Sequence, residues 1–394
     1  MLEVDQSPVE TKFVQNPYVF YREILREGGV CFWKNYNQKA FFKFETINKI
    51  FKDKRFGREL PPGIEQTNEK ELSNFYRIEK NSMLELEGKR HSRLRGLVLR
   101  AFTTKNIQRI SKDIDTLCYD LLNRIKDKEI DLIENYAKQV PVITIARLLG
   151  IPEEMSDQLL KWSNRMVAVY QADISEKTKS LANQSSREFF EYIEKYVAER
   201  RSSPADDLIT HLINAKEDNQ KLNFDELVST CILLLNAGHE ATVHTIGNGI
   251  KALLLNKVDC RFLKEKDWDN IVEEILRYDP PLHIFTRFAY ENLNIDNIDI
   301  TQGEKISLVI GASGHDERRW DNPTEFTPNR RPKNHNSFGA GSHFCLGAPL
   351  ARLEIKLALK NLFDKKKCIK ILQDPEYADI YHFHGLKSLN VEMH

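Results

Sequence analysis

The sequence lacks the features that would place the chain in a membrane or on nucleic acid. Its first residues contain no basic stretch followed by an apolar core, so no secretory signal is predicted. No apolar run approaches the roughly 20 residues that a membrane-spanning helix needs. Acidic and basic residues balance at 58 each, which excludes a strong overall field for nucleic acid or anionic lipid.

The chain also lacks paired cysteine spacing and any segment that would divide it. Its six cysteines are scattered, which fits reduced thiols in a cytoplasm rather than a disulfide framework. No internal repeat, low-complexity tract or linker rich in Pro, Gly or Ser is visible. A chain of 394 residues can bury a large core together with a whole cofactor. We therefore expect a cytoplasmic protein with a single domain over residues 1–394.

Helical periodicity dominates what is present. Between about 92 and 260, apolar residues recur at helical spacing in five segments, 106–127, 134–149, 154–171, 185–201 and 225–256. The last segment has no Lys or Arg before Lys251, so much of it should be buried. Further helices are predicted over 17–27 and 267–278 and from Gly347 to about Phe363, with a helix break at 203–206.

Strand-like patterns are few and short. They cover 30–33, 39–44, alternating residues within 284–311, and a closing hairpin at the carboxyl end. The fold class predicted from these patterns is mainly α, with a small antiparallel β-rich side.

The sharpest local signal is the loop over residues 338–347, F-G-A-G-S-H-F-C-L-G. Its three glycines allow sharp turns and a close approach of backbone to a flat ligand. Cys345 sits just before a predicted helix, where unsatisfied amides and the helix dipole favour the thiolate. A haem iron needs such a thiolate when its task is O–O cleavage. The alternative is a structural cysteine, the interpretation adopted for Cys31, Cys118, Cys231, Cys260 and Cys368.

The pattern F-G-x-G-x-H-x-C-x-G in this loop resembles the cysteine-ligand loop of the cytochrome P-450 family, with all six specified positions present. The following APLARLE is similar too, and the likeness extends from Asn16-Pro17-Tyr18 to Gly385-Leu386 in the order of soluble bacterial members. The resemblance implies one triangular, mainly helical domain with a small sheet-rich side. It also implies haem b with Cys345 as metal ligand, Phe338 and Gly347 as haem contacts, and haem-thiolate monooxygenase activity.

Glu274 and Arg277 lie three residues apart on one helical face, where a carboxylate and a guanidinium can pair. Alone, this spacing more often marks a solvated face. Its position about seventy residues before the cysteine loop matches the family, as does Arg330 as a third partner. The resemblance assigns all three a structural role behind the haem pocket.

Four cationic groups match the family positions that hold the haem propionates. His91 and Arg95 are four residues apart and so share a helix face, and Arg287 and His343 are the other two. Partly buried carboxylates need such partners. The alternative for each residue is an ordinary surface cation.

The long helix carries the candidate catalytic residues. Helical spacing puts Gly238, Ala241, Thr242 and Thr245 on one stripe, and a small residue at 238 would let the helix lie over a flat cofactor. By resemblance, Glu240 is the acid that delivers protons during oxygen activation. Its alternative is a carboxylate that pairs with a local base.

Ala241 departs from the family pattern, because a threonine usually stands there. Thr242 acting through water, a hydroxyl of the substrate, or poorly coupled or different haem chemistry would account for the departure. We favour the first two.

By family position, the substrate should meet mainly apolar side chains from several segments: Met83, Leu234, Ala237, Ile284, Phe285 and Phe383. An apolar or amphipathic small molecule follows, although apolar residues at this spacing are equally normal in a core.

No flavin or nicotinamide domain is fused to the chain, so electrons should come from an acidic ferredoxin with a separate reductase. Arg93, Arg100 and Lys105 are candidates for the surface that meets it. An ordinary solvated basic face is the alternative. Two further alternatives concern the reaction: a peroxide-driven oxygenase or decarboxylase, suggested by Ala241, and a non-catalytic haem sensor or carrier.

Overall fold

The computed structural model describes most of the chain. The residues described are 1–61, 63–64, 70–101, 104–171, 174–216, 220–331, 334–366, 368–379 and 381–394, without the side chains of 101, 104–109 and 262. The backbone forms two compact units, each built from separated segments. The first unit contains Met1–Gly57, Asp115–Val140 and Ala241–His394, and the second contains Arg58–Ile114 and Pro141–Glu240.

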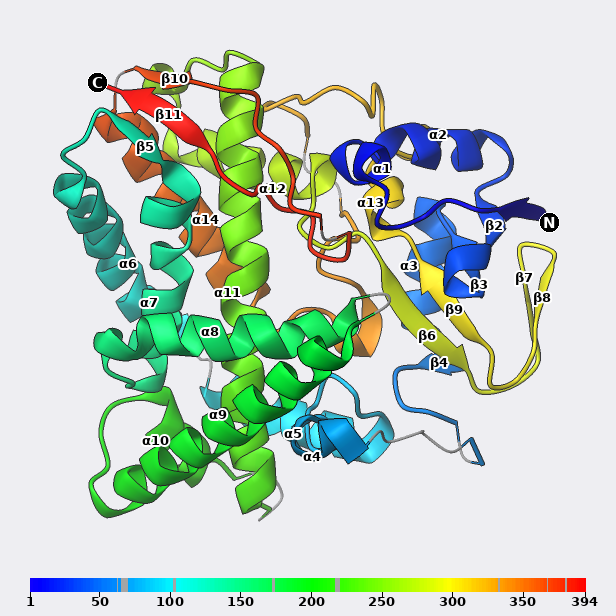
Figure 1. The fold of residues 1–394 in the computed structure, drawn as a ribbon, viewed down its shortest axis with the longest axis horizontal. Coiled ribbons are helices and arrows are strands. Elements are labelled where there is room, and N and C mark those ends of the chain that lie inside the picture. Colours follow the sequence, from blue (N-terminus) through cyan, green and yellow to red (C-terminus); the bar gives the residue numbers. More distant parts are fainter. Residues whose placement is uncertain are drawn as a thin grey trace. The chain divides into compact units, whose positions relative to one another are not determined.

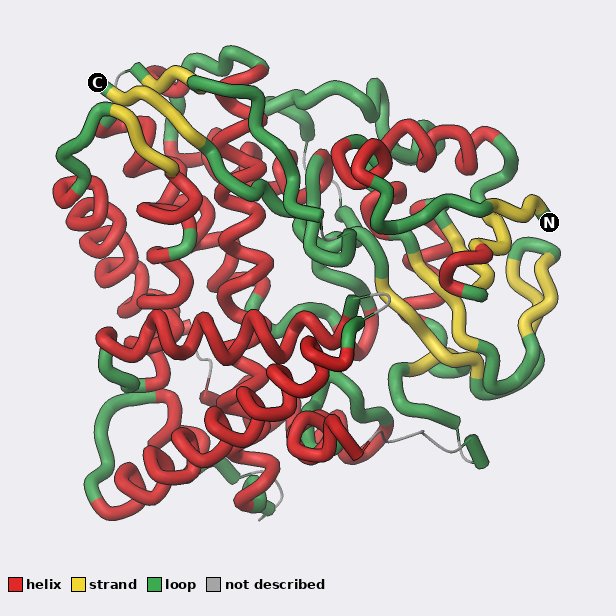
Figure 2. The backbone as a smooth tube through the Cα atoms, in the orientation of Figure 1, coloured by secondary structure: helices red, strands yellow, loops and turns green. Residues whose placement is uncertain are grey.

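The second unit is helical. Its elements are η2 (Lys70–Leu72), α4 (Ser73–Glu79), α5 (Gly88–Ala101), η4 (Glu153–Met155), α8 (Ser156–Val167), η5 (Ala168–Tyr170), α9 (Glu176–Ser202) and α10 (Leu208–Asn214). Helix α9 packs against α4, α8 and α10, as Figures 1 and 2 show. The side chain of Asp207 accepts the Thr210 amide at 2.8 Å and so caps α10, which explains why the helices break where predicted.

Three helices carry residues of both units: α6 (Thr104–Arg124), α7 (Gln139–Leu149) and α11 (Phe224–Leu255). The prediction of one long buried helix over 225–256 is confirmed. The unit boundary falls between Glu240 and Ala241 within it.

The first unit holds the sheets and the remaining helices. Its helices are α1 (Thr11–Gln15), α2 (Tyr18–Arg26), η1 (Lys34–Tyr36), α3 (Phe44–Lys52), η3 (Ile133–Ala137), η6 (Cys260–Phe262), α12 (Glu265–Tyr278), α13 (Ile310–Ser313), η7 (Gly341–His343) and α14 (Ala348–Lys365). Helix α12 stops at Asp279 because the following Pro280 excludes the helical conformation there.

Six strands form the larger sheet, in the order β1 (Leu2–Val4), β2 (Val30–Trp33), β3 (Gln38–Phe41), β9 (Lys305–Leu308), β6 (Phe285–Ala289) and β4 (Phe56–Gly57). The pairs β1/β2 and β3/β9 are parallel and the other three are antiparallel. The sheet is therefore mixed, because β9 returns to β3 from far along the chain. A separate hairpin pairs β7 (Leu293–Ile295) with β8 (Ile298–Ile300).

The carboxyl end is not the simple hairpin that the pattern predicts. Strand β11 (Asn390–Met393) pairs with β10 (Ile369–Ile371), but a long connection separates them. The other edge of β11 pairs with β5 (Glu129–Asp131), which the sequence did not reveal. Similarly, the strand expected over 39–44 ends at Phe41, and α3 begins at Phe44, whose amide is bound by the Asp316 carboxylate at 3.0 Å.

A hydrophobic core lies between the larger sheet and α3. Its buried members include Phe41, Ile47, Ile50, Phe51, Phe56, Ile306 and Leu308. Burial of each large apolar side chain contributes roughly 1.5–3 kcal/mol. Within the described residues, no helix is both long and apolar enough to span a bilayer.

Candidate functional site

The cysteine loop is set by two glycines in the left-handed region. Gly339 has φ +68° and Gly341 has φ +70°. A Cβ on Gly341 would also collide with the backbone carbonyl of Phe51. After these turns the Cys345 amide donates to the Phe338 carbonyl at 2.9 Å, and α14 begins three residues later.

Cys345 differs from the other cysteines in its surroundings. Burial raises the pKa of Cys31, Cys118, Cys231 and Cys260 to about 12, so these remain thiols near neutral pH. Cys368 is exposed, whereas Cys345 is half-buried.

The loop has open space for a flat cofactor beside the sulfur that would bind its metal. Gly347 caps α14, yet a Cβ there would meet no neighbouring atom of the chain within 4 Å. Open space beside a half-buried thiol ahead of a helix is the setting that a planar thiolate-ligated cofactor requires.

A second acid–base cluster, missed by the sequence analysis, connects α12 and α14 next to the cysteine loop. Glu273 of α12 accepts from Arg352 of α14 at 2.5 and 3.0 Å, and His335 lies 3.2 Å away. Burial favours a higher pKa for Glu273, but the hydrogen bonds from His335 and Arg352 outweigh it and lower the pKa to about 2. The guanidinium of Arg352 also lies 4.5 Å over the Phe338 ring. The doublet Glu273-Glu274 and the arginine in APLARLE were the available signals.

Glu274, Arg277 and Arg330 meet in a buried ion-pair cluster. Arg277 donates to both oxygens of Glu274 at 2.8 Å, and Arg330 Nε lies 3.1 Å from one of them. The rest of the Arg277 fork donates to the carbonyls of Gly314 and Pro323, both at 2.7 Å. Full hydrogen bonding is what makes such a buried pair tolerable.

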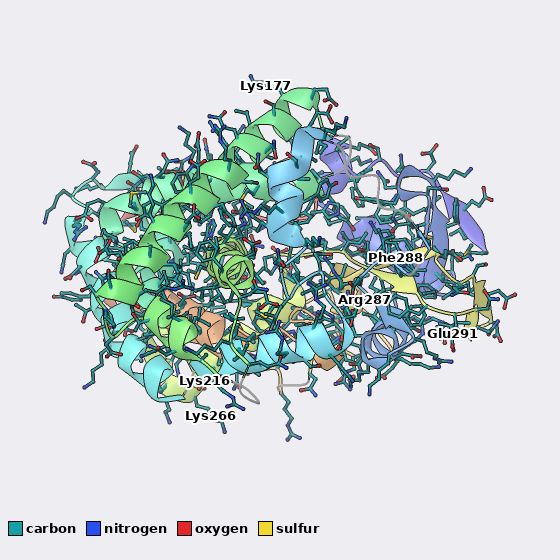
Figure 3. All side chains as sticks on the ribbon, turned by 90° about the horizontal axis from the view of Figure 1, so that it is seen from below. Lys177, Lys216, Lys266, Arg287, Phe288 and Glu291 are labelled. Atoms are coloured by element: carbon teal, nitrogen blue, oxygen red, sulfur yellow. The ribbon has the colours of Figure 1, made fainter. Side chains whose placement is uncertain are left out.

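Arg287 and His343 belong to the same unit as the loop, and His343 is part of it. Arg287 lies on β6 (Figure 3) and is 5% exposed. Its guanidinium lies 4.9 Å over the Phe51 ring. One of its terminal nitrogens donates to the Thr286 carbonyl at 2.8 Å. His343 ends η7, two residues before Cys345, and is half-buried.

His91 and Arg95 lie one turn apart on α5 in the second unit. His91 is 3% exposed and Arg95 is half-buried, so neither is the freely solvated cation of the alternative interpretation.

The accessible stripe of α11 differs from the predicted one. Ala237, Gly238, Ala241 and His244 lie at helical spacing and are accessible or half-buried, as are Leu233, Asn236 and Glu240 of the same stretch. Thr242 and Thr245 are instead buried, at 4% and 1% exposure. The Thr245 hydroxyl turns back to the Ala241 carbonyl at 2.7 Å.

Glu240 lies in a polar setting within the second unit. His239 Nε2 is 3.3 Å from its Oε2, and in the orientation that satisfies its amide, Asn164 donates to the same oxygen at 2.9 Å. His239 Nδ1 is fixed by the Leu235 carbonyl at 2.7 Å. A local base therefore does stand beside this acid.

The predicted pocket residues divide between the units. Met83, Leu234 and Ala237 belong to the second, and the first two are nearly buried. In the first unit, Phe285 packs against Phe51 at 6.1 Å between ring centroids and so joins the core. Ile284 is buried, and Phe383 is half-buried 6.3 Å from the His244 ring.

Two of the three residues predicted to meet the electron donor have described side chains, Arg93 and Arg100. The guanidinium of Arg93 forms an ion pair with the buried Glu226, and Arg100 donates to the Lys216 carbonyl at 2.8 Å. The side chain of Lys105 lies outside those described.

Comparisons with known proteins agree with the family resemblance of the cysteine loop. The family model described as Cytochrome P-450 matches residues 63–258 and 268–368. The polyketide biosynthesis cytochrome P-450 PksS of Bacillus subtilis is 36% identical over 98% of both chains. The biotin biosynthesis cytochrome P-450 of the same organism is 30% identical over 99% of both. The crystal structure of P450BioI in complex with hexadec-9Z-enoic acid ligated acyl carrier protein superposes with a TM-score of 0.91 at 29% identity, covering 98% of this chain and 99% of that one.

Proposed function

The chain belongs to the cytochrome P-450 family, and from this premise we propose that Cys345 is the residue through which it binds haem iron. The protein is an oxidoreductase, a monooxygenase with haem b held by a cysteine thiolate. One observation supports Cys345: two left-handed glycines place its half-buried sulfur directly ahead of α14. Bound haem supplies the iron chemistry that inserts one oxygen atom of dioxygen into a substrate.

The absorption spectrum of the reduced, carbonyl-bound protein tests this assignment. The red-shifted band of a thiolate ligand is expected in the native protein and in Cys368→Ala. Cys345→Ala should lose it. A nitrogen-ligand spectrum in the native protein would contradict the assignment.

The remaining haem contacts belong to the same proposal. Arg287 and His343, together with His91 and Arg95, hold the propionates by charge-assisted hydrogen bonds. Phe338, Gly347 and Gly238 give the ring its close backbone and aromatic contacts. The burial of Arg287 and His91 supports these roles, since a hydrogen bond to a propionate is stronger away from bulk water.

Glu240 holds the proton needed during oxygen activation, at its Oε2, with Asn164 and His239 orienting the carboxyl group. Because Thr242 is buried and Ala241 has no hydroxyl, a water or a hydroxyl of the substrate supplies the remaining hydrogen bond. Glu274, Arg277 and Arg330 act only as scaffold.

The substrate we propose is an apolar chain of acyl or polyketide type. The names of two relatives support it: one is a polyketide biosynthesis protein, and the other was crystallised with a fatty acid linked to a carrier protein. Met83, Leu234, Ala237, Ile284 and Phe383 line its path, whereas Phe285 serves the core. A screen of free fatty acids and their carrier-protein thioesters for a low-spin to high-spin shift tests this class. Shifts caused only by compact polar molecules would contradict it.

The electron donor, the domain organisation and the cellular compartment are also proposals. A ferredoxin with a separate reductase donates the electrons, and residues 1–394 act as one haem domain in the cytoplasm. Relatives that share nearly their full length with this chain support the single domain. Six free cysteines support a reducing compartment. A peroxide-driven oxygenase or decarboxylase is the second candidate, favoured by the burial of Thr242 beside Ala241.

A further inference from the structure

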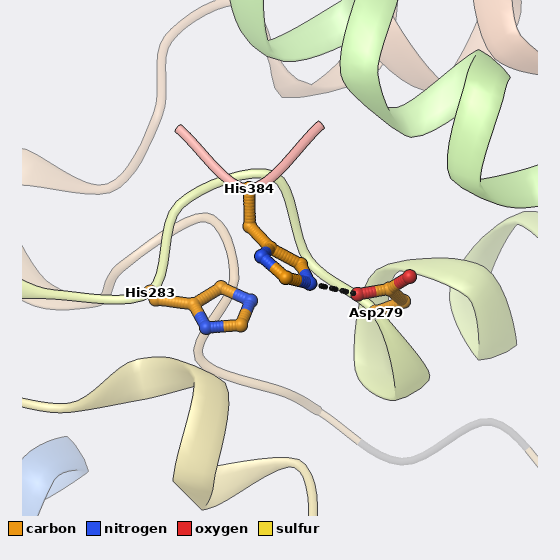
Figure 4. A group of neighbouring side chains, drawn as sticks. All are labelled: Asp279, His283 and His384. Atoms are coloured by element: carbon orange, nitrogen blue, oxygen red, sulfur yellow. Dashed lines mark ion pairs between the residues drawn. The ribbon is translucent and has the colours of Figure 1, made fainter. Parts of the chain in front are cut away.

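A buried group of two imidazoles and a carboxylate lies outside the cysteine loop. Asp279 follows α12, His283 stands four residues later, and His384 comes from the carboxyl-terminal loop (Figure 4). One ligand atom from each lies within 4.8 Å of the other two. All three side chains are at most 3% exposed.

His384 is the unusual member. Neither of its ring nitrogens has a hydrogen-bond partner among the residues that the structure describes. Its Nε2 lies 3.4 Å from Asp279 Oδ1 (Figure 4). Its ring stacks on Tyr377 at 3.7 Å between centroids. Burial, with Lys251 and His244 adding to it, lowers the pKa of His384 well below its ordinary value. A neutral, buried imidazole without a partner is unfavourable unless something else binds it.

His283 is held as a metal-binding histidine usually is. The Tyr21 hydroxyl lies 2.7 Å from Nδ1 and also 2.7 Å from the Tyr381 hydroxyl. Tyr21 can accept the Nδ1 proton while donating to Tyr381, and in that tautomer the Nε2 lone pair is available to a metal ion. A ligating histidine commonly donates its second ring nitrogen to such a partner.

Asp279 is oriented by two tyrosines. Tyr18 donates to Oδ1 at 2.7 Å and Tyr377 donates to Oδ2. Each carboxylate oxygen keeps a further lone pair. The Tyr18 hydroxyl is also 3.4 Å from His283 Nε2, so it stands beside the same point in space.

We propose that Asp279, His283 and His384 bind a zinc ion. Two histidines and a carboxylate are an established zinc donor set, with ligand atoms about 2.0–2.2 Å from the metal. Tetrahedral ligands at that radius are about 3.4 Å from one another, which is the separation of Asp279 Oδ1 and His384 Nε2. Tyr18 lies beside the fourth position.

Lys251 is the cation of α11 that faces this group. Its ammonium bonds the Tyr377 hydroxyl and lies 3.9 Å from the centre of that ring, not against the three donors.

The ion would join three segments of the first unit: the end of α12, the entry to β6 and the carboxyl-terminal loop. Leu282 and Phe383, the neighbours of the two histidines, form an isolated antiparallel bridge. The zinc would therefore brace the backbone that carries Ile284 and Phe383. Its role is structural.

Metal analysis of the haem-loaded protein tests the proposal. The protein is dialysed against a chelator, equilibrated with Zn²⁺, and freed of unbound metal before zinc and haem are counted. We expect one zinc per haem and, at Zn²⁺ one hundred times the Kd, a rise in Tm of about 3 °C. His384→Gln, His283→Gln and Asp279→Asn should each reduce zinc content at least tenfold.

His315→Gln is the matched control. His315 is also buried and its ring lies 4.3 Å from that of Tyr18, but it is not one of the three donors. This variant should keep its zinc. Native protein with neither zinc nor a Tm response overturns the proposal without any variant, as does His384→Gln that retains as much zinc as His315→Gln. The thiolate spectrum reports separately on Cys345, so the two proposals fail independently.

Discussion

At the scale of single residues, two partly buried glutamates differ in the groups that contact their carboxylates. Glu240 has Asn164 and His239 at its carboxyl group, whereas Glu273 has Arg352 and His335. Glu240 is half-buried and precedes Ala241, which has no hydroxyl group. The arrangement at Glu273 fixes an anion permanently. In the proposed function, Glu240 transfers the proton, whereas the contacts of Glu273 give it a structural role.

Glu240→Gln should lower product formation with ferredoxin and reductase by about 100-fold, since general acid catalysis typically contributes that much. The thiolate carbonyl band should remain, because the haem ligand is untouched. Glu199→Gln, on α9 of the same unit, should leave turnover within about twofold. If Glu240→Gln stays active, its carboxylate is merely the partner of His239.

Glu273→Gln should destabilise the fold above pH 4.5 by about 2–3 kcal/mol. The folded pKa of about 2 lies below the ordinary 4.5, so the charged form stabilises the native state. This contribution is fully present above pH 4.5 and is lost as the pH falls toward 2. Urea unfolding at several pH values measures it: the difference between native and variant should shrink across that window. The exposed pair of Asp259 and Arg261 offers the control Asp259→Asn, for which little change at pH 7 is expected. A difference independent of pH would refute the assignment.

At the scale of elements, the cysteine loop is held by what surrounds it. Gly341 packs against the end of α3, and the Glu273 cluster joins α12 to α14 behind Phe338. The orientation of side chains on α11 likewise depends on neighbouring elements, because Thr242 and Thr245 are buried against them. The position of the sulfur is therefore a property of three helices and not of the loop alone.

Gly341→Ala should reduce haem content by at least half. It combines an unfavourable positive φ with a collision against the Phe51 carbonyl. Haem per protein, measured after purification, is the readout. Gly28→Ala is the control, since Gly28 has φ +110° but no atom near its Cβ position. It should lose about 1–3 kcal/mol of stability from backbone strain while keeping its normal haem content. Full haem loading in Gly341→Ala would show that the loop tolerates rearrangement.

At the scale of the whole molecule, the match to the cytochrome P-450 family model covers residues of both compact units. Arg93 is already neutralised by Glu226. Arg93 nevertheless remains partly exposed and Arg100 is exposed, so a basic helix face that meets the electron donor stays a prediction.

Product formation should require ferredoxin, reductase and NAD(P)H, and peroxide alone should give less than about a tenth of that rate, because Glu240 provides the acid that the reductive route needs. Both reactions are compared on a substrate that gives a high-spin shift, with the rate per haem as the measurement. Heat-inactivated reductase is the control. Comparable or faster turnover with peroxide would select the second candidate function.

The sequence by itself determined the chemistry that depends on local pattern. The loop around Cys345, the Glu274–Arg277 spacing and the single helix over 225–256 could all be predicted, because turn glycines and helical periodicity act within a few residues. The family and its haem-thiolate chemistry followed from those motifs.

Only the tertiary structure decided which distant groups meet. Packing between separate segments brings Glu273, His335 and Arg352 together and pairs β5 with β11. It also forms the ion pair between Arg93 and Glu226 and buries Thr242. The same packing gathers Asp279, His283 and His384. Their spacing along the chain carries no periodic signal, since contacts between remote segments arise from how the helices and strands pack and not from the order of their residues.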